Sequence, residues 1–318
     1  MLVKNPVTNF PALCRDAAGY STVLPEKHKD FKNILVAGMG GSAISGNIIK
    51  DFLRDRVKVP MEVARSFSLP KYADNKTLLL CVSYSGNTKE TLNCFEHAMK
   101  SGCKTVVISS GGEISRRAKD QGLPLITIPG GMQPRDAFPF LFFSTLNCLK
   151  EAGIIDYDYA KIWEFLERRK DECTQEAEAA AEKILGTIPF IYGTSEGICM
   201  RLKAEINENA KMHAKFEVYP EVNHNEVVGW QGKTGRISAM FLRGLDENSD
   251  VSKTMDFLTE EIERENKAKV IQIKASGSNW LERAFYLIYT GDLLSHFLAE
   301  KSGAEREEVE FIEKIKSL

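Results

Sequence analysis

Short runs of apolar residues alternate with longer amphipathic segments in the first half of the chain. The runs are NILVAGMGG, TLLLCVSYSGN, KTVVISS and LPLITIP, and segments such as SAISGNIIKDFL and TKETLNCFEHAMKSG lie between them. Buried parallel strands are nearly continuous apolar runs, and each is joined to the next by a helix that crosses back over the sheet. The pattern therefore predicts βαβ units and a parallel sheet.

The same order recurs in the second half. The runs TIPFIYG, KFEVYPEV, RISAMFLR and KVIQIKA are typical of strands, and helices are predicted at 200–211 and near 251–266. A largely apolar helix is expected at 137–149, and the last apolar segment echoes it, because Ala137-Phe138 recurs as Ala284-Phe285. A repeat of about 150 residues indicates two copies of one doubly wound unit.

A charged, alanine-rich stretch separates the two halves and predicts an exposed connecting helix. We expect a first domain at 1–155, a connecting helix at 156–185 and a second domain at 186–318. The predicted fold class is α/β, with two doubly wound parallel-sheet domains of three αβα layers. A chain of 318 residues is long enough for two domains of ordinary size.

Composition narrows the function classes. The formal net charge of -2 lacks the basic excess of a protein that neutralises nucleic-acid phosphates. The seven cysteines form no C-x-x-C pair, and the start MLVKNPVTNF has no apolar signal core, which indicates a cytoplasmic protein with reduced thiols. The apolar segment 137–149 is too short for a membrane span. No nucleic acid or membrane partner is expected.

The loop 83–88 is the strongest chemical signal. Ser83, Ser85 and Thr88 follow a buried strand and open a helix, so their hydroxyls and the free N–H groups of the helix start converge on one spot. One cap needs one hydroxyl, whereas three hydroxyls with Gly86 favour an anion such as phosphate.

The loop 38–43 follows an earlier strand and matches the dinucleotide fingerprint G-x-G-x-x-A, with Glu62 near the place of a ribose-binding acid. An NAD-dependent dehydrogenase is therefore an alternative. Gly40, Gly41 and Ser42 are equally able to donate N–H groups and a hydroxyl to a sugar phosphate from the opposite wall.

These two loops resemble the sugar isomerase (SIS) domain, and the whole chain is similar to the archaeal bifunctional phosphoglucose/phosphomannose isomerases. The similarity continues through N-E-N-A-K at 207–211 and P-E-V-N-H-N-E at 220–226, ending in G-W at 229–230. The S-x-S-G-x-T motif is typical of sugar-phosphate binding in general, and the later motifs are more specific to this family.

The resemblance implies a role for each matching residue. Gly41, Ser42, Ser83, Ser85 and Thr88 would hold the substrate, and Arg135 would face the reacting carbons. Glu208 would be the catalytic base, and His224 would assist ring opening from the neighbouring subunit, which implies a homodimer with shared active sites. Lys301 and Ser295 are the nearest candidates for a lysine and a hydroxyl that the family places in the site.

The predicted function is a cofactor-independent aldose-ketose isomerase. It would interconvert glucose 6-phosphate or mannose 6-phosphate with fructose 6-phosphate through a cis-enediol, which one carboxylate can catalyse by moving a proton between neighbouring carbons. No metal is expected, because His213 and His224 lack an H-x-x-x-H partner. A non-catalytic SIS-type regulator is the other alternative; it would keep the serine loop without a use for Glu208.

Overall fold

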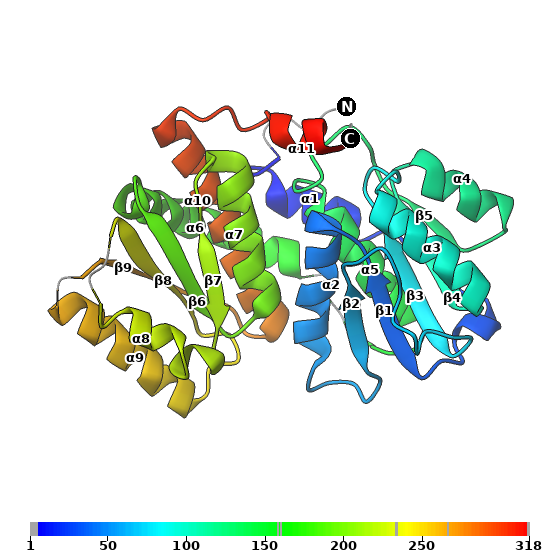
Figure 1. The fold of residues 1–318 in the computed structure, drawn as a ribbon, viewed down its shortest axis with the longest axis horizontal. Coiled ribbons are helices and arrows are strands. Elements are labelled where there is room, and N and C mark those ends of the chain that lie inside the picture. The colour runs from blue at the N-terminus through cyan, green and yellow to red at the C-terminus, as the bar shows by residue number, and fades with distance from the viewer. Residues whose placement is uncertain (1–5, 158, 160, 233–234, 266, 317–318) are drawn as a thin grey trace. The chain divides into compact units, whose positions relative to one another are not determined.

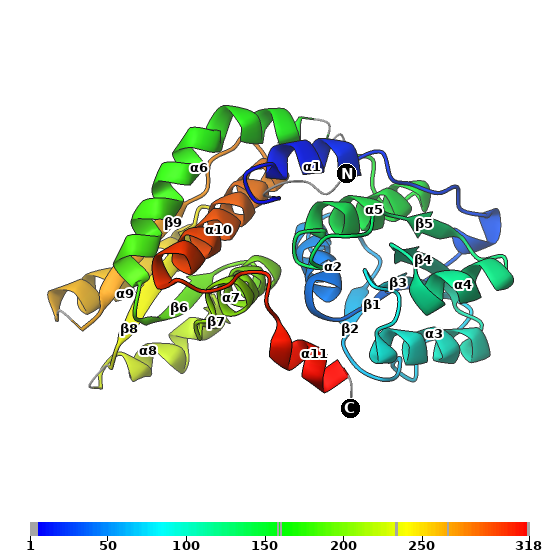
Figure 2. The same ribbon diagram turned by 90° about the horizontal axis from the view of Figure 1, so that it is seen from above.

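The computed structural model describes residues 6–157, 159, 161–232, 235–265 and 267–316. The chain divides into two compact units, Met1–Trp163 and Glu164–Leu318. Figures 1 and 2 show the elements of both units from two directions.

The first unit contains a five-stranded sheet. Its strands are β1 (Asn33–Ala37), β2 (Met61–Ala64), β3 (Thr77–Val82), β4 (Lys104–Ser109) and β5 (Leu125–Thr127). They are parallel, in the order β2-β1-β3-β4-β5. The order reverses between β1 and β3, which is where doubly wound sheets bind their ligands.

Helices cover both faces of this sheet. They are α1 (Phe10–Ala17), α2 (Gly40–Leu53), α3 (Lys89–Ser101), α4 (Gly112–Asp120) and α5 (Phe138–Glu151). Alternate side chains of β3 face opposite layers, so Leu79 and Cys81 pack with Phe95 of α3 and Ile114 of α4. Helices α1, α2 and α5 lie on the other face (Figure 2).

The second unit repeats this plan with four strands. They are β6 (Ile188–Gly193), β7 (Lys215–Val218), β8 (Ile237–Arg243) and β9 (Lys269–Lys274), all parallel in the order β7-β6-β8-β9. Its helices are α6 (Ile162–Ile184), α7 (Glu196–Ala210), α8 (Glu226–Gly229), α9 (Ser249–Arg264), α10 (Trp280–Ser302) and α11 (Glu310–Lys316). The first four strands of the two sheets thus follow the same order.

The core of the second unit also has two sides. Phe241 of β8 packs with Met255 and Leu258 of α9 and with Trp230, whereas α7 packs mainly on α10 (Figure 1). Each unit is therefore a three-layer αβα sandwich, which confirms the predicted fold class. Among the described residues, no helix combines the length and apolar character that crossing a bilayer needs.

Candidate active site

The loops after β1 and β3 lie side by side in the first unit, because these parallel strands are neighbours and end at the same edge of the sheet. The backbone N–H of Tyr84 donates to the Ser42 hydroxyl over 3.4 Å. This contact joins the two loops that the sequence predicts to bind a sugar phosphate.

Two hydroxyls of the loop 83–88, those of Ser83 and Thr88, are hydrogen-bonded to each other. Buried Ser83 accepts a hydrogen bond from the N–H of Gly86 and donates one to the Thr88 hydroxyl, both at 3.2 Å. Thr88 is the N-cap residue of α3, yet its side chain makes no capping hydrogen bond. The loop is therefore more than a helix cap, and Thr88 leaves the N–H groups of the first turn of α3 for another acceptor.

Gly86 fixes the shape of this loop. Its φ of 72° is in the left-handed region, and a Cβ there would lie 1.9 Å from the carbonyl oxygen of Gly111. Only glycine fits such a close backbone approach. The loop is consequently held against the segment after β4 in one conformation.

Arg135 lies in the turn before α5, next to the loop 40–42. A Cβ added to Gly41 would meet the carbonyl oxygen of Pro134 at 3.3 Å and the Cα of Arg135 at 3.7 Å. Arg135 is buried, and its guanidinium lies 3.5 Å from the Gln133 side chain. The first unit thus brings together Gly41, Ser42 and Arg135.

Tyr84 links the loop 83–88 to the segment before Arg135. Its buried hydroxyl accepts the backbone N–H of Met132 over 2.9 Å, and burial raises the pKa of Tyr84. The phenol therefore stays protonated and neutral near pH 7, so it adds no negative charge to the loop 83–88.

The same geometry counts against a dinucleotide site. A ribose-binding acid belongs at the carboxyl end of β2, whereas Glu62 is the second residue of that strand and accepts a hydrogen bond from Tyr72. The strand ends at Ala64, and the next residue is Arg65. The position at which a dehydrogenase would carry its ribose-binding carboxylate therefore has no acidic residue, which counts against the dehydrogenase alternative.

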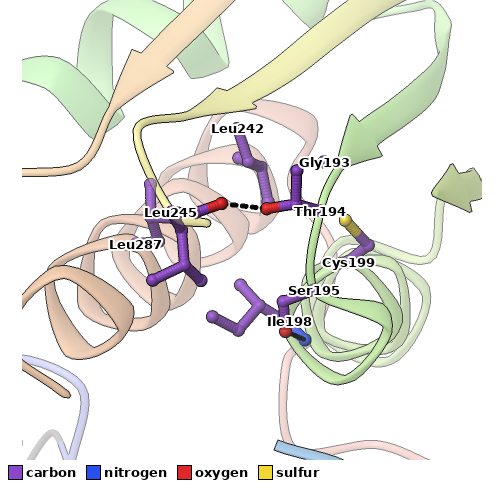
Figure 3. Close-up of a pocket in the computed structure, with 8 residues that line it drawn as sticks. All are labelled: Gly193, Thr194, Ser195, Ile198, Cys199, Leu242, Leu245 and Leu287. Atoms are coloured by element: carbon purple, nitrogen blue, oxygen red, sulfur yellow. Dashed lines mark hydrogen bonds between the residues drawn. The ribbon is translucent and has the colours of Figure 1, made fainter. Parts of the chain in front are cut away.

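The second unit has a loop equivalent to 83–88, and this loop is closed. Asp246, two residues before the N-cap of α9, has a φ of 50° and takes the place of Gly86. Figure 3 shows a narrow space that is lined in part by Leu245 of this loop. Its walls are Gly193, Thr194, Ser195, Ile198, Cys199, Leu242, Leu245 and Leu287.

An internal carboxylate occupies the anion-binding groups of this second loop. Glu247 accepts the N–H of Gly244 at 2.7 Å and pairs with Arg243 at 2.6 Å. The hydroxyl of Ser195 and the side-chain oxygen of Asn248 cap their own helices. Of the two equivalent loops, the one at 83–88 is therefore the one suited to an external phosphate.

Glu208 lies in the last turn of α7 and lines a groove of about 550 Å³ in the second unit. The groove residues are Asn207, Glu208, Lys211, Met212, His213, Glu308, Val309, Glu310, Phe311 and Ile312. The other wall is thus the segment that contains α11. Sequence reasoning assigned no element or role there, although the spacing of Val309, Ile312 and Ile315 is typical of a helix face.

The asparagines beside Glu208 make hydrogen bonds to other parts of the second unit. Asn207 donates to the carbonyl oxygen of Met212 over 2.6 Å. Asn209 donates to the carboxylate of Glu205 at 2.9 Å and to the hydroxyl of Ser295 at 2.8 Å. Ser295 is therefore a buried structural contact of α7.

His224 follows the short helix 221–223 and is exposed. The segment after it is anchored to the sheet, because the Trp230 Nε1–H donates to the Tyr192 hydroxyl at 2.9 Å, which donates to Glu226 at 3.1 Å. Glu226 and Trp230, which belong to the motif at 220–230, therefore have a structural role in holding this segment.

Glu208 and His224 of one chain lie at opposite edges of the second sheet. Helix α7 runs from the carboxyl end of β6 back to the amino end of β7, and Glu208 is near its end, roughly 18 Å along the helix from Glu196. His224 follows the carboxyl end of β7, where Tyr219 bonds to Gly193. Figure 1 shows α8 and the carboxyl end of α7 at opposite ends of the unit.

Lys301 lies on a different surface. Its ammonium group contacts α6, at 3.1 Å from Glu182 and 3.8 Å from Glu178, and it does not line the groove of Glu208. Among the described residues, no group of three or more His, Cys, Asp or Glu side chains is arranged to hold a metal ion.

Comparison with known proteins places the chain in a family. It is 35% identical over 311 residues to a bifunctional phosphoglucose/phosphomannose isomerase of Caldicellulosiruptor bescii, which covers 92% of this chain and 91% of that protein. The chain belongs to the bifunctional phosphoglucose/phosphomannose isomerase family. The family described as "Bacterial phospho-glucose isomerase C-terminal SIS domain" matches residues 173–318 of it.

One further relative and one solved structure are also similar to this chain. A D-glucosamine-6-phosphate 4-epimerase of Sulfolobus acidocaldarius is 33% identical over 70% of both chains. The C-terminal domain of glucosamine-fructose-6-phosphate aminotransferase from Francisella tularensis has a TM-score of 0.70 at 15% identity, covering 95% of this chain and 97% of that one. The latter likeness concerns the fold alone.

Proposed function

We propose that this sugar-phosphate isomerase interconverts glucose 6-phosphate or mannose 6-phosphate with fructose 6-phosphate, without a cofactor and through a cis-enediol. The single observation that supports it most is the loop 83–88, where the Ser83 and Thr88 hydroxyls meet at a helix start that the Thr88 side chain does not cap. The equivalent loop of the second unit is filled by Glu247, which restricts the proposed phosphate site to the first unit.

The proposed roles follow from residue chemistry. Ser83, Ser85 and Thr88 hold the phosphate through charge-assisted hydrogen bonds. Arg135, which is always protonated, stabilises the negative charge that develops on the enediolate oxygens. Glu208 removes a proton from one carbon and returns it to the next, as a positioned general base can do.

His224 moves the proton that opens the sugar ring, and we propose that it does so in the site of a second chain. The two residues of one chain lie at opposite edges of the second sheet. A single substrate can use both only if they come from different chains. A homodimer with shared active sites meets this requirement.

A coupled assay tests the proposed reaction. Chelator-treated protein is offered glucose 6-phosphate and mannose 6-phosphate separately, and fructose 6-phosphate formation is measured. We expect turnover of at least one hexose without added metal or nucleotide. Turnover that is lost on chelation and restored by zinc would contradict the cofactor-free mechanism.

The relative that is a 4-epimerase suggests a second candidate function, which is action on an amino-sugar phosphate. The same assay series includes glucosamine 6-phosphate, with product identified by NMR as epimerised or isomerised. Epimerisation at C4 with no turnover of either hexose phosphate would favour this second function over the first.

A further inference from the structure

A buried ionic cluster joins α7 to α10 on the turns of α7 that precede Glu208. Arg201 donates two hydrogen bonds to the carboxylate of Asp292, at 3.0 Å and 2.7 Å, and its Nη1 lies 3.1 Å from Glu205. All three side chains are at most 6% exposed. Burying three charges is costly unless they are paired and fixed in position, so this cluster holds the two helices in one alignment.

The cluster reaches the turn that carries Glu208. Glu205 accepts from Asn209, and Asn209 also donates to Ser295 of α10, whose hydroxyl donates to the carbonyl oxygen of Asp292. Asn209 is fully buried and adjacent in sequence to Glu208. The last turn of α7 is thus bonded to α10 on one side, while Glu208 is left on the groove side.

We propose that Asp292, Arg201 and Asn209 are positioning residues that hold Glu208 at the reacting carbons. The inference rests on the proposed role of Glu208 as the base. A general base that is displaced by about 1 Å loses much of its rate. Asn209, adjacent to Glu208 in sequence, is bonded to Glu205 of the cluster and to Ser295 of α10, so the cluster links α10 to this position.

The second unit offers a matched control. Arg243 is also paired with two carboxylates, Glu247 at 2.6 Å and Asp256 at 2.7 Å, but at the carboxyl edge of the sheet, away from Glu208. Asp292→Asn and Glu247→Gln each remove one carboxylate and leave one arginine with one acid. Asp292→Asn leaves the buried pair Arg201–Glu205, and Glu247→Gln leaves Arg243 paired with Asp256, whose side chain is 55% exposed. We expect both variants to fold with a lowered Tm.

The experiment compares kinetics in these variants. We expect Asp292→Asn to lower kcat for fructose 6-phosphate by at least tenfold with KM changed less than threefold, and Glu247→Gln to keep kcat within twofold of the wild type. In the Glu208→Gln background, Asp292→Asn should add no further loss, because a positioning effect disappears with the group it positions.

Three results would overturn the proposal: wild-type kcat in Asp292→Asn, an equal fall of kcat in Glu247→Gln, or losses that multiply in the double variant. Ser295→Ala is a milder second variant, which should lower kcat in the same direction if Asp292→Asn does not fold. Wild-type turnover in Glu208→Gln alone would instead contradict the role of Glu208, so the two failures are distinguishable.

Discussion

Single residues decide whether the loop after β3 binds an anion. The Ser83 hydroxyl accepts a hydrogen bond from the N–H of Gly86 and donates one to the Thr88 hydroxyl. The Ser85 hydroxyl accepts the N–H of Asn87 at 3.3 Å. Ser85 is exposed and Thr88 partly so, which leaves both hydroxyls accessible to a ligand. In the equivalent loop of the second unit, Glu247 forms an ion pair with Arg243 instead.

Replacing Ser85 and Thr88 by alanine should weaken phosphosugar binding. Each lost hydrogen bond to a charged phosphate is worth roughly 1.5–3 kcal/mol. Calorimetry with fructose 6-phosphate measures the loss, and Asn248→Ala, which removes a true cap in the second unit, serves as the control. Unchanged affinity in the double variant would place the phosphate site elsewhere.

The Glu208→Gln variant should bind fructose 6-phosphate as well as the wild type but turn it over more slowly by a factor on the order of 10² or more, because the amide cannot accept the proton. In heavy water its substrate should gain no deuterium at C1 or C2. Glu196→Gln, at the other end of α7, controls for the loss of one charge on this helix. Turnover near the wild-type rate in Glu208→Gln would exclude this residue as the base.

Among the elements, the short helix α11 matters most for the site. It contributes Glu310, Phe311 and Ile312 to the groove that Glu208 also lines. All its described side chains are largely exposed, with Phe311 at 77% and Ile312 at 40%. A helix of seven residues depends on such packing because isolated helices of this length are unstable in water.

Ile312→Asp should loosen the packing of α11 and lower kcat. A carboxylate next to Met212 in the apolar part of the groove is poorly hydrated, so the helix gains hydration free energy by moving away. Phosphate binding by the first unit should persist, and the loss is measured as kcat for fructose 6-phosphate. Ile315→Asp, on a residue that does not line the groove, is the control. Equal kinetics in both variants would show that α11 does not shape the site.

For the whole molecule, the positions of Glu208 and His224 require cooperation between chains if both act on one substrate. We expect Glu208→Gln and His224→Ala proteins to be inactive on closed-ring sugars when separate. Mixing them should restore activity, because one site of a heterodimer then draws both intact residues. The measurement is turnover of glucose 6-phosphate after subunit exchange has been confirmed by mass. Activity that stays absent would indicate that each chain supplies its own pair.

Local sequence patterns determined the strands, the two loops and the parallel architecture of this protein. Apolar runs such as Leu78–Val82 are buried on both faces of the sheet, and this is readable from the run itself. The left-handed backbone conformation at position 86 requires glycine. The elements that the pattern did not predict, α1, α8, α11 and β2, are short. In β2 only Ala64 is buried, so its periodicity is weak.

Contacts between residues far apart in sequence were decided by the tertiary structure. Asn209 binds Glu205 and Ser295, because the face of α7 packed on α10 excludes water and its polar groups must be paired there. Glu247 is also largely buried, and it pairs with Arg243 and with the N–H of Gly244 in the second loop because buried polar groups must find partners. The direction of α7 across its sheet separates Glu208 from His224, and this separation depends on chain topology, which no local spacing of residues encodes.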